Sequence, residues 1–315
     1  MRIRDKIKKP QRPVVAYEIL PPREKDGTLN SYAEIISSLL SQTHIDAINI
    51  PEVLDEEGRG ERPVANQKRG EPREFGRLLQ DIVGVEAIIN RVVVHESYDV
   101  QMKWMEETNK EYEIENMIIV GGESSNVDYP GPSVNEVLKS VSREFNNNGG
   151  DIFCGGIAIP SRNTESKNLI KKSENGSEFF TTQVLYDSGN IVKMIENYQN
   201  RCDELNTFPR RLLLSFAPVS SQKNIDFLKW LGVDIPTETE RYLHARPGSM
   251  TERSLDVAIE VLNDTLDSIS EKNLKVPIGL NVEHIMSYNF QSSVEMLQEL
   301  ARIYREFCIK SQQYS

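Results

Sequence analysis

Short runs of apolar residues alternate with longer amphipathic segments along the chain. A short continuous apolar run is typical of a strand buried on both faces of a parallel sheet, and apolar residues spaced three or four apart are typical of a helix with one buried face. The runs predict strands at residues 14–20, 47–50, 87–94, 117–120, 152–157, 179–185, 212–216 and 276–282. The amphipathic segments predict helices at residues 29–41, 71–82, 100–110, 134–145, 166–174, 191–202, 222–231, 255–270 and 292–307.

This alternation fits an α/β fold, a (β/α)8 TIM barrel, in which a helix follows each strand. We expect a single domain over residues 1–315, with residues 1–12 as a short N-terminal extension. An open, doubly wound sheet is the alternative, but its usual glycine-rich first turn is missing, because Pro21 and Pro22 follow the first strand. We interpret the charged residues 55–71 as a long loop at the barrel mouth and not as a linker between domains.

Composition narrows the class of protein. The net charge is −11, so we expect no nucleic-acid partner and no anionic membrane surface, both of which need a basic face. The cysteines and histidines show no metal-ligand spacing, so we expect no metal site, and the sparse cysteines suit a reducing compartment. No apolar run approaches the ~20 residues of a membrane span, and no signal peptide is recognisable. We therefore expect a cytoplasmic protein, and the sequence leaves open whether it forms a homo-oligomer.

The most unusual position in the apolar pattern is Glu18, a lone carboxyl group near the end of the first predicted strand. A buried carboxylate is costly unless it is paired or placed in a functional cleft, and burial raises its pKa. In barrels of this kind, catalytic groups lie at the carboxyl ends of the strands. Glu18 is therefore our candidate general acid or base, and the alternative is a structural ion pair with an arginine at the opposite end of the barrel.

Other polar residues near strand ends extend this candidate site. Gln183 lies in the apolar sixth strand, where its amide either recognises a ring with paired donors and acceptors or finds partners in the core. Glu283 ends the eighth strand and Arg162 follows the fifth, so we expect both to contact the substrate. For Arg162, solvation at the surface is an equally good explanation.

Three further positions are candidates for binding a cofactor. Gly122 belongs to a pair of glycines after the fourth strand, which would let a ligand approach the backbone closely. Asn168 and Lys172 lie four residues apart, on one face of a predicted helix. Lys172 either contacts a phosphate there or is a solvated surface lysine.

Several segments of the chain resemble a known enzyme family. Residues 17–23, Tyr-Glu-Ile-Leu-Pro-Pro-Arg, resemble the strand-one signature of methylenetetrahydrofolate reductases. The stretch from Asn168 to the motif Phe-Thr-Thr-Gln-Val-Leu-Tyr-Asp at 180–187 resembles its fifth helix and sixth strand. Residues 216–221 and 231–236 are similar to its strand-seven segment. Together the matches occur in the family's order over most of the chain.

The resemblance implies a barrel that reduces 5,10-methylenetetrahydrofolate, or a related pterin, to the 5-methyl form, with NAD(P)H as hydride source. It implies that Glu18 protonates N10 of the folate, which opens the ring to an iminium cation that accepts the hydride. Gln183 would orient the pterin. Glu123 matches the family's acid after the fourth strand, whose negative charge would stabilise the cation.

Family members usually carry the hydride on FAD, but the flavin contacts are only partly retained. Asn168 and Lys172 match contacts to the flavin diphosphate, and Asn90 stands where the family has a flavin-contacting histidine. The family's phosphate-binding arginine falls on Gly121, and residues 50–56 resemble a flavin-independent, actinobacterial-type branch. The expected reaction therefore runs with or without bound FAD, and a direct nicotinamide or a deazaflavin-like carrier is the alternative route.

Two other classes of function stay open. A barrel methyltransferase or lyase would act on a folate-like ligand without a redox step, which the loss of flavin contacts permits. A non-catalytic partner subunit would keep only the scaffold, but such a scaffold has no reason to bury Glu18 and Gln183.

Overall fold

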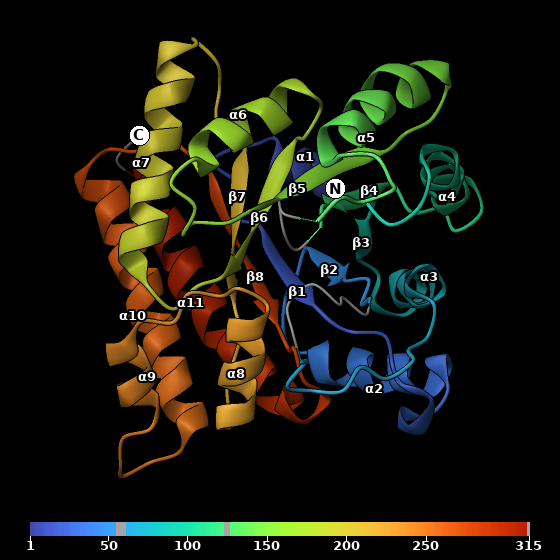
Figure 1. The fold of residues 1–315 in the computed structure, drawn as a ribbon. Coiled ribbons are helices and arrows are strands. Elements are labelled where there is room, and N and C mark those ends of the chain that lie inside the picture. Colours follow the sequence, from blue (N-terminus) through green and yellow to red (C-terminus); the bar gives the residue numbers. More distant parts are fainter. Residues whose placement is uncertain (55–60, 123–126, 314–315) are drawn as a thin grey trace.

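The computed structural model describes the chain apart from residues 55–60, 123–126 and 314–315. Its centre is a closed barrel of parallel strands, and helices surround the barrel (Figure 1). The eight strands follow one another in chain order, and β1 pairs with β8 to close the barrel. The expected single-domain (β/α)8 barrel is confirmed.

The strands lie where the apolar runs predict them, and their ends are shifted by one or two residues at most. They are β1 (Val15–Glu18), β2 (Ala47–Ile50), β3 (Glu86–Val92), β4 (Asn116–Val120), β5 (Phe153–Ala158), β6 (Phe179–Val184), β7 (Arg211–Phe216) and β8 (Ile278–Glu283).

The helices also follow the predicted order, with two additions. They are α1 (Ile3–Ile7), α2 (Leu29–Leu40), α3 (Pro72–Val83), α4 (Tyr98–Lys110), α5 (Val134–Ser140), α6 (Glu165–Glu174), α7 (Ser188–Glu204), α8 (Gln222–Trp230), α9 (Thr237–Leu243), α10 (Met250–Glu271) and α11 (Phe290–Gln313). The additions are α1 and α9, which are too short to show the apolar period of a helix.

Helix α1 covers the amino-terminal end of the barrel. Ile3 and Ile7 are buried in a cluster with residues from the first halves of several strands, such as Ala16 and Phe179. The guanidinium of the buried Arg211, at the start of β7, donates from Nε to the carbonyl of Ile7 at 3.1 Å and also bonds the carbonyls of neighbouring residues. These carbonyls follow the last turn of α1, so the arginine satisfies groups that the helix leaves unpaired.

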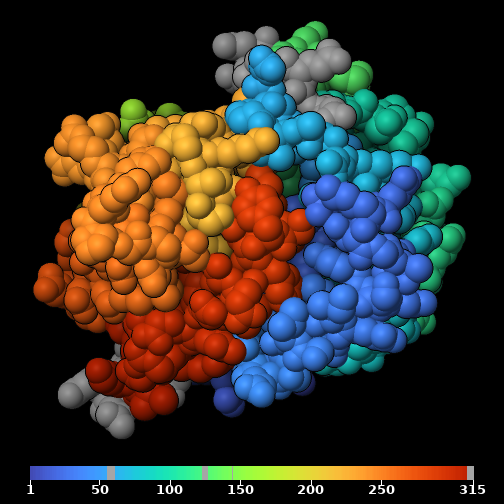
Figure 2. All heavy atoms as spheres, turned by 90° about the horizontal axis from the view of Figure 1, so that it is seen from below, coloured from blue at the N-terminus to red at the C-terminus, as the bar shows by residue number. Residues whose placement is uncertain are grey.

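The two ends of the barrel sequence lie side by side. Gln298 of α11 donates from Nε2 to Oγ1 of Thr43 at 3.0 Å, just after α2. Figure 2 shows this arrangement, with the last part of the chain in red lying against the early part in blue. The closure of the barrel thus brings β8 and the loop after it next to β1.

A local irregularity in β6 matters for the site. The pairing of β6 with β7 shifts register between Thr181 and Val184. Thr182 accepts a hydrogen bond on Oγ1 from the backbone nitrogen of Ser215 at 2.9 Å, in place of a regular ladder contact. Irregularities of this kind redirect a side chain, and Gln183 lies within this one.

Candidate active site

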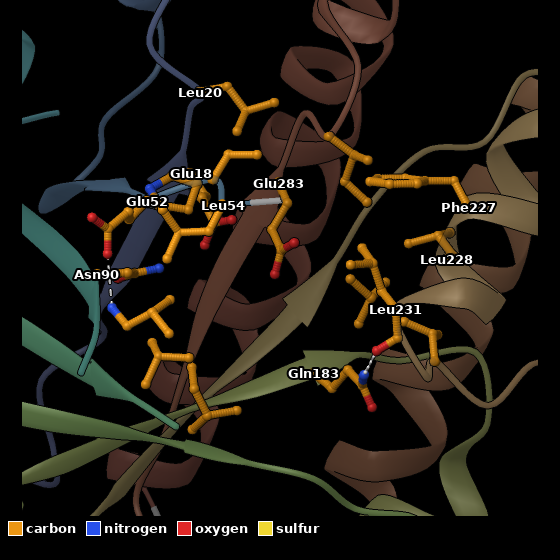
Figure 3. Close-up of a pocket in the computed structure, with 18 of the residues that line it drawn as sticks. Glu18, Leu20, Glu52, Leu54, Asn90, Gln183, Phe227, Leu228, Leu231 and Glu283 are labelled. Atoms are coloured by element: carbon orange, nitrogen blue, oxygen red, sulfur yellow. Dashed lines mark hydrogen bonds between the residues drawn. The ribbon is translucent and has the colours of Figure 1, made fainter. Parts of the chain in front are cut away.

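The carboxyl ends of the strands surround a cavity of about 530 Å³. Polar side chains from different strands, Glu18, Gln183 and Glu283, lie around it (Figure 3). The remaining wall is largely apolar, and Figure 3 shows Leu20, Leu54, Phe227, Leu228 and Leu231 there. An apolar cavity with a few convergent polar groups is the usual form of a small-molecule site.

Glu18 is the last residue of β1 and faces this cavity. Its Oε2 accepts hydrogen bonds from Nδ2 of Asn49 at 2.6 Å and from Nδ2 of Asn281 at 3.3 Å. Within the described part of the chain it forms no ion pair, so the alternative of a structural pair with an arginine at the far end does not hold. Burial raises the pKa of Glu18 to about 7, and the hydrogen bond from Asn281 opposes that rise.

Glu283 ends β8 and lies opposite Glu18 in the register of the two strands. Its Oε1 accepts a hydrogen bond from Nδ2 of Asn281 at 3.3 Å, so one amide nitrogen contacts both carboxyl groups. Burial and the nearby charge of Glu18 raise the pKa of Glu283 well above its usual range. The structure thus brings together two acids that we expected to have separate tasks.

Gln183 lies across the cavity from these acids (Figure 3). Its Nε2 donates to the backbone carbonyl of Leu231 at 2.9 Å, which fixes the orientation of the amide. One of its two polar atoms is therefore satisfied by the protein, and the carbonyl oxygen is left for a ligand. A contact with the protein backbone thus positions a side chain that lines the cavity, and recognition of a ring by Gln183 stays a prediction.

His284 also lines the cavity, although its place after the eighth strand indicates no more than a loop residue in the sequence. The side chain is buried, and neither ring nitrogen has a hydrogen-bond partner in the described residues. Burial lowers the pKa of His284 to about 3, so the ring is neutral and carries one donor and one acceptor. Asn90 of β3 is similar, since its buried Oδ1 has no such partner either. Unsatisfied buried groups on a cavity wall favour a polar ligand.

Lys172 lines the cavity from α6, so it is not a solvated surface lysine. Its Nζ donates to the carbonyl of Ile157 at 2.5 Å and to Oε1 of Glu165 at 3.4 Å, and burial lowers its pKa. Glu165 is fully buried, and its Oε2 also accepts a hydrogen bond from Asn168 at 3.0 Å. Asn168 is not among the residues that line the cavity.

The remaining candidates have different environments. Arg162 lines the cavity but is exposed, which suits a position at its mouth. Gly122 also lines the cavity, yet the ring of Tyr129 covers its backbone, because a Cβ at Gly122 would lie 2.2 Å from that ring. The ring therefore fills the space on the side of Gly122 where a Cβ would lie. Glu123 lies outside the described residues.

Charged donors hold the two phosphates of a bound flavin most strongly. On the α6 side of the cavity, the ammonium of Lys172 is matched by the carboxylate of Glu165, which also holds Asn168. Gly121, at the position of the family's arginine, provides no side chain. Apart from Arg162 at the exposed mouth, the described residues that line the cavity on this side therefore leave no uncompensated positive charge for a flavin diphosphate.

The described residues contain neither a metal cluster nor a membrane span. No group of three or more His, Cys, Asp or Glu side chains is placed to hold a metal ion there. No helix in that part of the chain is long and apolar enough to cross a membrane.

Comparison with a solved structure agrees on the fold. An uncharacterized protein from Clostridium thermocellum, described as binding two copies of 5-methyl-5,6,7,8-tetrahydrofolic acid, superposes with a TM-score of 0.77 at 20% identity, over 96% of this chain and 99% of that chain. The Bacillus cereus spore cortex-lytic enzyme SleL has a TM-score of 0.49 at 8% identity, over 91% of this chain and 74% of its own. A TM-score below 0.5 does not establish a common fold for these two proteins.

Sequence comparison identifies the family. No curated protein sequence matches the chain significantly. The family described as methylenetetrahydrofolate reductase matches residues 2–300, which is nearly the whole barrel. This agrees with the resemblance of the segments around Glu18 and Gln183. The chain therefore belongs to the methylenetetrahydrofolate reductase family.

Proposed function

We propose that the protein reduces the methylene bridge of 5,10-methylenetetrahydrofolate, or of a related pterin, to a 5-methyl group with a hydride from NAD(P)H. The observation that carries this proposal is Glu18, a carboxyl group in a cavity wall whose pKa burial raises to about 7. At neutral pH such a group is protonated in a large share of the molecules, and it can give its proton to a weakly basic nitrogen. The bound 5-methyl folate of the Clostridium thermocellum protein, which would be the product here, supports the proposal.

In the proposed reaction, Glu18 transfers its proton to N10 of the folate. The bond between N10 and the methylene carbon breaks, its electron pair stays on N10, and N5 and the methylene carbon form an iminium cation. NAD(P)H supplies the hydride that this carbon accepts. Once Glu18 is a carboxylate, it faces the cation across a cavity of low dielectric, which stabilises the cation.

Other groups would bind and orient the pterin. Gln183 is held by Leu231 and can accept a hydrogen bond from the ring through its amide oxygen. The apolar wall that includes Phe227 suits the face of a planar heterocycle. Arg162, exposed at the mouth, is placed to meet the acidic tail of a folate.

We further propose that the hydride passes directly from the nicotinamide, because the described residues on the α6 side of the cavity offer a flavin diphosphate only the exposed Arg162 as an uncompensated cation. A nicotinamide nucleotide enters and leaves in each turnover, so weaker contacts at an exposed rim are sufficient. The absorbance of the purified protein tests this point. We expect a colourless protein, and a stoichiometric flavin spectrum would contradict the direct route.

The scarcity of charged donors for a flavin diphosphate also favours one other function, a methyltransferase or lyase that uses a folate-like ligand without a redox step. Incubation of the protein with methylenetetrahydrofolate and NADH or NADPH separates the two. Our proposal requires that nicotinamide oxidation and 5-methyltetrahydrofolate appear in equal amounts. Conversion of the folate without nicotinamide oxidation would support the alternative, and no conversion with either nucleotide would exclude the proposed reaction.

A further inference from the structure

The carboxyl groups of Glu18 and Glu283 form one unit, which we call the acid pair. Their strands are neighbours in the barrel, and the two residues are partners in the register of β1 and β8. Nδ2 of Asn281 lies 3.3 Å from Oε2 of Glu18 and 3.3 Å from Oε1 of Glu283. Figure 3 shows both side chains directed into the same cavity. Two carboxyl groups this close in a buried site interact strongly.

No cation neutralises the acid pair, as far as the described residues show. Asn49 and Asn281 contribute neutral amides, and Ser215 of β7 donates from its hydroxyl to Glu283. The amide nitrogen of Asn281 is shared with Ser215, whose Oγ lies 3.0 Å from Nδ2. Neutral donors stabilise one negative charge, but two adjacent charges without a cation are unfavourable.

The titratable groups around the acid pair do not alter this balance. His284 follows β8 and is neutral, since burial lowers its pKa to about 3. Tyr186, after β6, is also neutral, because burial and the charge of Glu283 raise its pKa. Arg23 and Arg69 face His284 from the loops after β1 and β2, and Arg23 is paired with Asp26. Glu52, which lines the cavity after β2, is paired with Arg91 of β3.

We propose that Glu18 and Glu283 share a proton, and that Glu283 is a positioning residue that keeps Glu18 able to donate above neutral pH. This inference rests on the proposed function and adds a role for Glu283 beyond substrate contact. Burial raises the pKa of Glu18 to about 7 against the opposing hydrogen bond from Asn281, and burial together with the charge of Glu18 raises the pKa of Glu283 well above its usual range. The acid pair therefore releases its last proton at a higher pH than a single buried acid at this position would.

The proton balance of the proposed step is simple. Before the reaction, the acid pair holds one proton and one negative charge. The O–H bond breaks, the proton forms an N–H bond at N10, and both carboxyl groups become charged as the substrate becomes an iminium cation. The extra negative charge thus arises next to the new positive charge, which lowers the energy of the cation. After hydride addition neutralises the cation, the acid pair takes up a proton from water.

Infrared spectroscopy of the full-length protein tests the shared proton without any turnover. Ordinary carboxyl groups are ionised above a pH of about 6, so a carboxylic-acid carbonyl band that persists at higher pH reports the acid pair. We expect this band to persist above pH 8 in the wild type and to disappear around pH 7 in Glu283→Gln. Glu18→Gln should lower the midpoint in the same way, because either variant leaves a single buried acid. Glu136→Gln, at an exposed helix cap, is the matched control and should leave the band unchanged.

The pH profile of kcat for folate reduction is the second measurement. Activity needs the protonated acid, so we expect kcat to decrease as the pH rises. The midpoint of this decrease should lie about one pH unit or more lower in Glu283→Gln than in the wild type. Coincident band midpoints and coincident kcat profiles in the two proteins would overturn the inference. If the band shifts as expected but the wild type reduces no methylene folate, the acid pair stands and the proposed function fails.

Discussion

Asn49 holds the carboxyl group of Glu18 through a hydrogen bond of 2.6 Å from its Nδ2 to Oε2, across the pairing of β2 with β1. Asn49 is itself buried, and its Oδ1 has no partner among the described residues. The neighbouring strand thus positions the candidate acid.

Removal of the hydrogen bond from Asn49 should raise the pKa of Glu18. A donor stabilises the charged form of a carboxyl group, so Asn49→Ala should raise the pKa of Glu18 by about one unit. We expect kcat to fall by about tenfold at pH 7, because the carboxyl group is no longer fixed in place. Infrared titration of the carboxylic-acid band gives the pKa change, and a lower pKa in Asn49→Ala would contradict this arrangement.

Loss of the acid itself should be more severe. Glu18→Gln keeps the size of the side chain but removes the proton donor, so we expect turnover to fall by ~10²-fold or more, while the folate still binds. Steady-state kinetics and calorimetric folate titration measure the two effects. Equal activity in this variant would remove Glu18 from the mechanism.

The same substitution should stabilise the protein at alkaline pH. The pKa of Glu18 is raised on folding, so the folded chain binds more protons than the unfolded chain above pH ~4.5, and the free energy of unfolding falls as the pH rises. Glu18→Gln has no group that loses its proton here. We therefore expect its free energy of unfolding to exceed that of the wild type by about 1–3 kcal/mol at pH 8 and to equal it near pH 4. Urea denaturation at both pH values checks the sign, and a less stable variant at pH 8 would contradict burial as the cause.

Gln183 offers a test of pterin recognition. In Gln183→Glu the donor to the carbonyl of Leu231 is lost and a negative charge faces the cavity, so folate affinity should fall by about tenfold or more. The free energy of unfolding should fall by only about 1 kcal/mol, the typical value of one hydrogen bond. Binding and denaturation experiments compare the two losses. A larger loss of stability than of affinity would make Gln183 a structural residue.

Arg211 should matter for folding and not for chemistry, because it lies at the opposite end of the barrel from the cavity. Arg211→Met leaves buried carbonyls around Ile7 and Lys9 without their donor, so we expect a loss of about 3 kcal/mol in the free energy of unfolding. The neighbouring Arg210→Met is the control, since Arg210 is half-exposed and pairs with Glu178, and its loss should stay below about 1 kcal/mol. Similar losses in both variants would argue against a special role for Arg211.

The order of strands and helices could be predicted from the sequence because burial on both faces leaves continuous apolar runs, and burial on one face leaves a helical period. Helix α9 was not predicted, because Thr237–Leu243 has a single buried residue, Leu243, and therefore no apolar period. The position of Glu18 in a cavity wall could also be predicted, because an ionisable group in an apolar run is conspicuous without any knowledge of its neighbours.

The partners of these charged residues depend on the tertiary structure. Glu18 and Glu283 stand at opposite ends of the chain, and nothing in the local sequence of either indicates that barrel closure makes them partners. In the same way, the charge of Lys172 was visible in the sequence, but its neutralisation by the buried Glu165 depends on how α6 packs against the barrel. Which residues are buried can be read from the local pattern, because transfer from water depends on each side chain alone. How their charges are matched depends on the folded arrangement, because electrostatic energy depends on distances between groups that the chain brings together only when it folds.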